Sequence, residues 1–178
     1  LASDSEELEG TLRVQSEGDD ATRFTLSLTS GDPDSLALPV RCDPDGSFHG
    51  FGEQYSATNL RGDRFELLLS EQGIGRDDPD AVFLSGTSHT TYFPMPWWLD
   101  ARGFGVLVDT DLRVSADVCS TDDQVAWIEV IGASEVSWTV MHGPSPLDVV
   151  RQLGDRVGRP SAPPDWAYGT WICTQGGE

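Results

Sequence analysis

Glycine and proline interrupt this sequence so often that long helices are excluded. The chain holds 19 glycines and 11 prolines in 178 residues, and neither residue is well tolerated inside a helix. Hydrophobic residues still make up 38% of the sequence, which is enough to bury a sizeable core. We therefore expect one medium-sized all-β domain, with room in the chain for the start of a second domain.

Short runs of alternating apolar and polar residues support this prediction. Val136, Trp138 and Val140 alternate with polar residues, which places them on one face of a sheet. Turn-forming residues separate such runs, and many short strands joined by turns indicate a β-sandwich. The expected strands are Thr11–Gln15, Arg23–Thr29, Phe65–Leu69, Phe104–Asp109, Val125–Ile131 and Val136–Met141.

The pattern changes near Gly143, where a helix is expected. Ser145 is a suitable N-cap, Pro146 fits the first helical position, and Gly158 provides the stop. The apolar residues that recur at helical spacing are Leu147, Val150, Leu153 and Val157.

A proline-rich connection and one more hydrophobic run end the sequence. Residues 159–165 contain three prolines, and the run from Trp166 to Thr174 looks like a strand that enters a loop. A strand without a partner cannot close a domain, so we expect the chain to continue beyond Glu178. Leu1 is not a start methionine, which indicates that the N-terminus is also processed or cut.

The charge of the chain disfavours two classes of partner. The formal net charge is -19, and all 11 basic residues are arginines. Nucleic acids and anionic membranes would be repelled by such a surface, because phosphate binding requires clustered basic residues. The sequence contains no 18-residue apolar stretch and no signal-peptide pattern. The cellular location stays open, with the cytoplasm favoured.

The cysteines and histidines do not predict a metal site. Cys42, Cys119 and Cys173 lie far apart and form no CxxC pair, so we expect three buried thiols and neither a zinc site nor a disulfide framework. The histidines, His49, His89 and His142, are equally dispersed and are expected to be structural. No metal and no cofactor are predicted.

Several motifs, in the correct order, carry a resemblance to a known family. The chain resembles the N-terminal β-sandwich of glycoside hydrolase family 31, along nearly its whole length from about Gly10. Within that family, residues 70–76 and 174–177 resemble the sulfoquinovosidase branch more than ordinary α-glucosidases or α-xylosidases. The motifs are Phe51–Tyr55, Asn59–Gly62, Tyr92–Pro96, Gly103–Val108, Gly158–Pro160 and Pro163–Trp166.

The resemblance implies a galactose mutarotase-like β-sandwich that leads into an eight-stranded β/α barrel. The expected division is a sandwich over residues 1–142, a linker helix and proline-rich connection over 143–165, and the start of the catalytic barrel over 166–178. Tyr168–Thr174 would be the first strand of that truncated barrel. The family's two catalytic aspartates lie on later barrel strands, so this chain is predicted to contain no catalytic residue. The isolated chain should therefore be inactive, while its parent hydrolyses α-glycosides.

Three residues are predicted to contact the sugar. Gln175 would follow the first barrel strand, and barrel enzymes place their sites at the C-terminal ends of strands. An amide can donate to and accept from neighbouring hydroxyl groups. In the resembling family a sandwich loop completes the pocket, which points to Glu71 and to Gln72 beside it. A carboxylate there accepts charge-assisted hydrogen bonds from hydroxyl groups.

Other notable residues are interpreted as structural. Arg76 precedes three aspartates and is expected to pair with them. Glu53 is expected to form an ion pair with Arg61 or Arg64 that fixes its loop. Trp97 and Trp98 are expected to pack between strands, where aromatic rings bury a large apolar area.

Two other functions are compatible with a β-sandwich. The first is a stand-alone carbohydrate-binding or structural domain. The second is an aldose mutarotase, which needs a histidine and a glutamate in one groove as acid and base. The substrate is undecided between an α-sulfoquinovoside and a neutral α-glucoside, and the sequence leaves the oligomeric state open.

Overall fold

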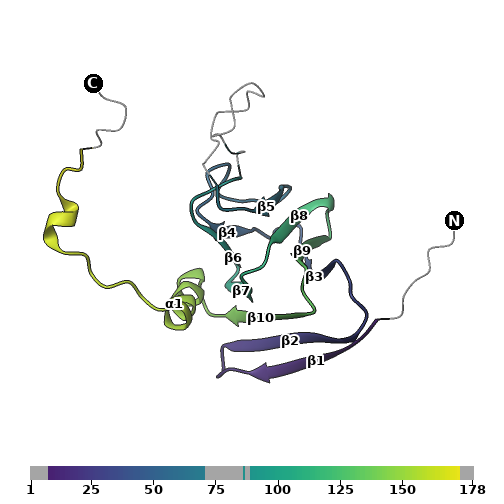
Figure 1. The fold of residues 1–178 in the computed structure, drawn as a ribbon. Coiled ribbons are helices and arrows are strands. Elements are labelled where there is room, and N and C mark those ends of the chain that lie inside the picture. The colour runs from purple at the N-terminus through teal and green to yellow at the C-terminus, as the bar shows by residue number, and fades with distance from the viewer. Residues whose placement is uncertain (1–7, 71–85, 87–88, 173–178) are drawn as a thin grey trace, which may run out of the picture.

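The described residues of the computed structural model, 8–70, 86 and 89–172, form two stacked antiparallel sheets (Figure 1). The first sheet has the strand order β1-β2-β10-β7-β6-β4, and the second has the order β3-β9-β8-β5. The strands are β1 (Glu9–Ser16), β2 (Ala21–Ser30), β3 (Ser35–Arg41), β4 (His49–Gly52), β5 (Arg64–Leu67), β6 (Pro94–Asp100), β7 (Phe104–Asp109), β8 (Val114–Asp122), β9 (Val125–Ile131) and β10 (Glu135–His142). The predicted β-sandwich is confirmed.

All six predicted strands are present, whereas β3, β4, β6 and β8 are additional. Proline normally argues against a strand, and both β3 (Pro39) and β6 (Pro94, Pro96) contain it. In β8 the pairing with β9 shifts register between Asp117 and Asp122, so the alternation along this strand is broken.

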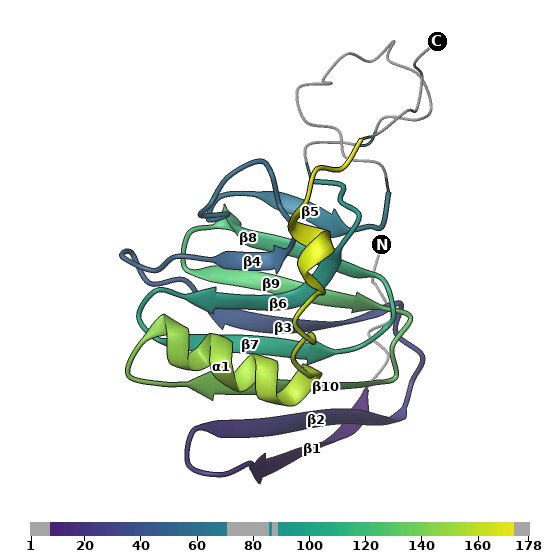
Figure 2. The same ribbon diagram turned by 90° about the vertical axis from the view of Figure 1, so that its left-hand side faces the viewer.

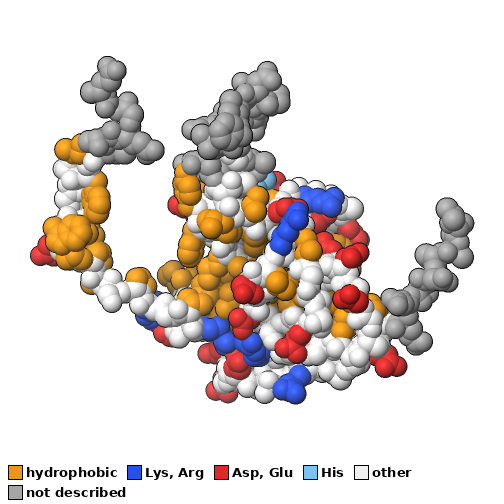
Figure 3. Space-filling model, viewed as in Figure 1, with side chains coloured by type: hydrophobic (Ala, Val, Ile, Leu, Met, Phe, Trp, Pro, Cys, Tyr) orange, Lys and Arg blue, Asp and Glu red, His pale blue; other side chains and the backbone are white. Residues whose placement is uncertain are grey.

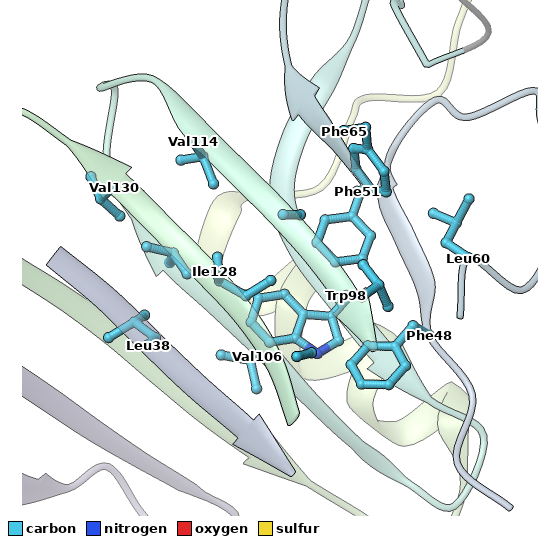
Figure 4. Packing of buried hydrophobic residues seen from close by; sticks show 14 of the residues in the cluster. Leu38, Phe48, Phe51, Leu60, Phe65, Trp98, Val106, Val114, Ile128 and Val130 are labelled. Carbon is cyan, nitrogen blue, oxygen red and sulfur yellow. The ribbon is translucent and has the colours of Figure 1, made fainter. Parts of the chain in front are cut away.

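Aromatic side chains fill the space between the sheets. Trp98 is fully buried and stacks on Phe51, with ring centroids 5.4 Å apart, and Phe51 meets the Phe65 ring edge to face (Figure 4). Trp97 lies on the opposite face of β6, beneath a helix, where it packs with Met141. The predicted packing role of both tryptophans is confirmed.

The helix α1 (Pro146–Val157) forms where the sequence predicts it, with Ser145 as N-cap and Gly158 after its end. It crosses the outer face of the first sheet (Figure 2). Of the apolar residues at helical spacing, Leu147, Val150 and Val157 are exposed and Leu153 is partly buried. Val149 is fully buried against the sheet, where a Cβ on Gly105 would lie 2.6 Å from its methyl group. Within the described residues, no helix has the length and apolarity needed to cross a membrane.

The described part of the C-terminal segment forms no strand. Asp165–Tyr168 is a short 3-10 helix, and residues 169–172 are irregular. The strand predicted over Tyr168–Thr174 is therefore not formed in its described portion. Trp166, Trp171 and Ile172 are all more than 70% exposed, so no other described element covers them.

Cys42 and Cys119 form a disulfide bond, so the prediction of three separate thiols is wrong. The two residues are 77 positions apart in sequence, and spacing alone cannot relate them. The fold brings them together because the backbone N–H of Cys42 donates to Gln124 in the turn between β8 and β9, close to Cys119 in β8. Their Cα atoms are 6.2 Å apart.

Candidate functional site

The three predicted sugar contacts, Glu71, Gln72 and Gln175, lie outside the described residues, as does Arg76. Their roles stay predictions. The described residues on either side of segment 71–85 show how the sandwich holds the chain that carries Glu71 and Gln72.

The sandwich brings both sides of this segment together at one end. Leu69 forms a β-bridge with Thr91, and the backbone N–H of Ser70 donates to the Thr91 carbonyl at 3.1 Å. Thr91 is fully buried, and its hydroxyl accepts a hydrogen bond from the backbone N–H of Phe93. Leu69 and Ser70, which precede segment 71–85, are therefore held in a fixed position beside Thr91, which follows it.

Glu53, the residue after β4, supports this arrangement. Its backbone N–H donates to the Phe93 carbonyl at 2.9 Å, and the Thr91 hydroxyl contacts its carboxylate at 3.5 Å. The approach requires the preceding Gly52, because φ is +85° there and a Cβ would lie 2.0 Å from the Phe93 oxygen. The backbone of β4 is thereby locked onto the strand that leaves the segment.

The carboxylate of Glu53 also accepts a hydrogen bond from the Tyr55 phenol. This bond raises the pKa of Tyr55 to about 12, with burial and the charge of Glu53 adding to the effect. The predicted ion pair of Glu53 with Arg61 or Arg64 is wrong. The Arg61 guanidinium instead donates to the carbonyls of Asp43 and Asp123, because the disulfide draws that corner of the fold together.

The described histidines are held by separate neighbours. His49 Nδ1 lies 2.7 Å from the Thr58 carbonyl, and His142 Nδ1 lies 2.9 Å from the Asp20 carbonyl. His89 lies next to the segment, where its ring stacks on Phe65 with centroids 4.8 Å apart. Across the described part of the chain, no three His, Cys, Asp or Glu side chains are close enough together to hold a metal ion.

A charged cluster lies at the opposite end of β6 and closes the turn into β7. Arg102 binds Asp100 through two hydrogen bonds, Nε to Oδ1 at 2.7 Å and Nη2 to Oδ2 at 3.0 Å, and also binds Asp43 at 2.6 Å. Burial opposes ionisation of Asp100. Hydrogen bonds from Arg102 and from the backbone of Ser47 outweigh this and hold the pKa of Asp100 below its ordinary value. We interpret the cluster as a structural clamp.

This clamp predicts a loss of stability in acid. A carboxylate whose pKa is lowered by folding stabilises the protein above its unfolded pKa, and this contribution disappears as the pH falls through the folded pKa. We expect the free energy of unfolding, measured with urea, to fall below about pH 4. The variant Asp100→Asn should lack about 1.5–3 kcal/mol of this pH-dependent stability. Equal losses in the variant and the wild type between pH 6 and pH 3 would contradict the interpretation.

Comparisons with known proteins identify relatives of this fold. No protein-family model matches the chain. The chain is 32% identical to a sulfoquinovosidase of Agrobacterium fabrum over 141 residues, which are 75% of this chain and 21% of that protein. It is 25% identical to a sulfoquinovosidase of Escherichia coli over 184 residues, covering 96% of this chain and 26% of the relative. An α-xylosidase of Lactiplantibacillus pentosus is 25% identical over 130 residues, 73% of this chain and 15% of that enzyme.

Solved structures show the same architecture. A family GH31 sulfoquinovosidase from E. rectale in complex with an aza-sugar inhibitor superposes with a TM-score of 0.78 at 20% identity, over 92% of this chain and 25% of that one. A cycloalternan-forming enzyme from Listeria monocytogenes gives a TM-score of 0.68 at 18% identity, over 90% of this chain and 18% of the enzyme. The chain thus spans about a quarter or less of these relatives. The predicted resemblance to the N-terminal β-sandwich of glycoside hydrolase family 31 is confirmed.

Proposed function

We propose that residues 1–178, as a chain related to the N-terminal region of family 31 glycoside hydrolases, belong to a retaining α-glycosidase that hydrolyses O-glycosyl bonds. The sandwich would shape the substrate pocket, and the catalytic carboxylates would lie on barrel strands outside this chain. The substrate would be an α-sulfoquinovoside or a neutral α-glucoside. The observation that carries the proposal is the 32% identity with a sulfoquinovosidase over 75% of the chain.

The described carboxylates support a shaping role for the chain. A glycosidase needs a general acid whose pKa is raised and a second carboxyl group about 5–5.5 Å away for a retaining mechanism. Four described aspartates, Asp43, Asp100, Asp117 and Asp148, have a pKa lowered from its ordinary value. Burial opposes ionisation of Asp100 and Asp117, yet hydrogen bonds from neighbours prevail at all four. Such groups are poor proton donors near neutral pH.

The anchoring of Ser70 supports a role for Glu71 and Gln72 in the pocket. Ser70 is fixed to Thr91 at one end of the sandwich, and Glu71 is the next residue. Figures 1 and 2 show the described C-terminal segment rising from α1 toward the same end. Gln175 is three residues beyond Ile172, the last residue described in that segment. We propose that all three residues donate to or accept from sugar hydroxyls.

Exposed apolar side chains on the sandwich and on the C-terminal segment support the proposal that a barrel packs against them. Apolar side chains gather on the face of the molecule that looks toward this segment (Figure 3). Phe93, directly before β6, is 63% exposed, and Trp166 and Trp171 are exposed on the segment itself. We propose that residues 166–178 begin the barrel and that the barrel covers these side chains, while residues 143–165 link it to the sandwich of residues 1–142.

The test is an assay of the parent protein with nitrophenyl α-glucoside and nitrophenyl α-sulfoquinovoside. We expect the parent to hydrolyse at least one of them with retention of configuration, and residues 1–178 alone to hydrolyse neither. A melting curve of the isolated chain controls for folding. A parent without turnover on either substrate would contradict the proposal and favour a stand-alone carbohydrate-binding or structural domain.

A further inference from the structure

Of the four edge strands in the described sheets, β1 has no feature that blocks pairing with a further strand. The other edges are β4, β3 and β5. β4 and β5 have only four residues each, and β3 contains Pro39, which has no N–H group. β1 has eight exposed residues and no proline, and no described element lies beyond it in Figure 2. An open strand edge of this length is a template for pairing with a strand of another chain.

Every second residue of β1 directs its backbone N–H and C=O groups to this open edge. The backbone N–H of Glu17 donates to the Ala21 carbonyl in the turn to β2, and bonded pairs recur at every second residue of an antiparallel ladder. The register shift between Glu9 and Gly10 places its extra residue on β2, so the alternation continues along β1. The odd-numbered residues therefore bond to β2. The residues that point to the open edge are Gly10, Leu12, Val14 and Ser16.

The two charged side chains of β1 have no partner within the described part of the chain. Seven described arginines form ion pairs, whereas Arg13 forms no ion pair and no side-chain hydrogen bond there, although acidic residues outnumber arginines by 30 to 11. Of Glu9, only the backbone N–H is bonded, to Ser30. Glu9 and Arg13 lie on the same face of β1 but about 13 Å apart, too far to pair with each other. Both charges are therefore available to another molecule.

A second copy of β1 offers a partner to both charges at once. When two copies pair antiparallel around a two-fold axis at Thr11, Glu9 of each copy lies directly opposite Arg13 of the other. Gly10 then meets Leu12, and both direct their backbone groups to the open edge, so the hydrogen bonds are satisfied as well. An axis at Leu12 leaves the charges without a direct partner, and an axis at Arg13 places two arginines opposite each other. The charges therefore favour the register centred on Thr11.

The apolar side chains of β1 fit the same register. Leu12 and Val14 are 57% and 56% exposed, and Leu12 lines an apolar cavity of about 510 Å³ between the two sheets. In the register centred on Thr11, Leu12 of one copy lies beside Gly10 of the other and diagonal to its Leu12, within reach of long side chains. Val14 meets Leu8, which directly precedes β1 and is 47% exposed. Pairing therefore covers apolar side chains that a single copy leaves in water.

We infer that the parent protein forms a two-fold dimer through β1, in which the six-stranded sheets of two copies join into one continuous sheet. Backbone hydrogen bonds, two ion pairs between Glu9 and Arg13, and the apolar side chains of the inner face hold it together. The net charge of -19 on this chain opposes association, but physiological salt screens charges that are more than about 8 Å apart. The inference does not depend on the proposed hydrolysis, because none of these residues is assigned to the sugar pocket.

Charge reversal tests the ion pairs, with sedimentation of the full-length parent as the measurement. The wild type should sediment as a dimer. Arg13→Glu and Glu9→Arg should each raise the dissociation constant about tenfold or more, because both ion pairs change from attraction to repulsion. A mixture of the two variants should recover the wild-type dissociation constant, since each copy then offers the charges that complement the other. Arg151→Glu, on the exposed surface of α1, is the matched control for net charge and should leave the dimer unchanged.

Three outcomes of the sedimentation experiment would overturn the inference. The first is a monomeric parent, which is also the result if another part of the protein covers β1. The second is a dimer that is equally tight in every variant, because its interface would lie elsewhere. The third is a mixture of Arg13→Glu and Glu9→Arg that associates no better than either variant alone. Each variant must melt as the wild type does, so that a loss of folding is not read as a loss of association.

Cysteine cross-linking tests the register independently. The two Thr11 Cα atoms would lie about 4.5 Å apart across the axis, within the range that a disulfide spans. In a parent that keeps only Cys42 and Cys119, Thr11→Cys should therefore form an intermolecular disulfide on mild oxidation. Gln15→Cys, on the same face of β1, is the matched control, because the two copies of that position lie about 26 Å apart. Cross-linking at both positions, at neither, or at position 15 alone would overturn the inference.

Discussion

Replacing Cys42 and Cys119 together by serine is expected to lower the free energy of unfolding by about 4–5 kcal/mol. The bond joins residues that are 77 positions apart. Cross-linking so long a loop removes many conformations from the unfolded chain, and the loss of the cross-link restores them. The Arg61 guanidinium, which lies 3.6 Å from the Cys119 sulfur, would also lose a contact. Urea unfolding followed by tryptophan fluorescence measures the change.

Cys173→Ser is the matched control for this prediction, because it keeps the bond between Cys42 and Cys119. We expect that variant to unfold within about 0.5 kcal/mol of the wild type. Reduction of the wild type should reproduce the effect of the double substitution. A double variant as stable as the control would show that the disulfide does not support the sandwich.

Glu71→Ala in the full-length parent is expected to lower kcat/KM by about tenfold to a hundredfold. The proposed carboxylate accepts charge-assisted hydrogen bonds from sugar hydroxyls, each worth about 1.5–3 kcal/mol. Gln175→Ala should lower kcat/KM less, because the hydrogen bonds of an amide are not charge-assisted. Initial rates on the better of the two nitrophenyl substrates measure both effects.

Glu66→Ala serves as the matched control for the charge. Glu66 lies on β5, four residues before Ser70, and its carboxylate pairs with Arg113 at the surface. Surface pairs contribute little, so kcat/KM and the melting temperature should stay unchanged. Wild-type kinetics in a folded Glu71→Ala variant would show that Glu71 does not contact the sugar. The same result for Gln175→Ala as well would show that this chain contributes no sugar contact and acts only as a scaffold.

The sequence predicts strands well where one face is buried and the other is polar. Val136, Trp138 and Val140 belong to β10, which lies inside the first sheet, and its neighbours on both sides keep the alternation regular. β3 and β6 are not recognised in the sequence because they contain prolines, and β8 because a register shift breaks its alternation. Whether a proline is tolerated in a strand depends on which edge of the sheet is free, and this is known only once the order of the strands is known.

Long-range partners are the part of the site that local sequence does not specify. Only the fold shows that the backbone at Gly52 lies against the Phe93 oxygen. Glu53 has two arginines nearby in sequence, yet its partners are Tyr55 and Thr91. The ends of the helix can be predicted from Ser145 and Gly158. Which of its residues is buried depends on a long-range contact, because Val149 packs where Gly105 has no side chain.

The central proposal is that this sandwich forms part of the sugar pocket of a glycosidase. It is tested most directly by a crystal structure of the parent with an aza-sugar inhibitor, in which the distance from the Glu71 carboxylate to the nearest sugar hydroxyl is measured. The account predicts a hydrogen bond of about 2.5–3.0 Å. A sugar bound in the barrel with the Glu71 carboxylate more than about 6 Å from every hydroxyl, beyond the reach of a bridging water, would contradict it.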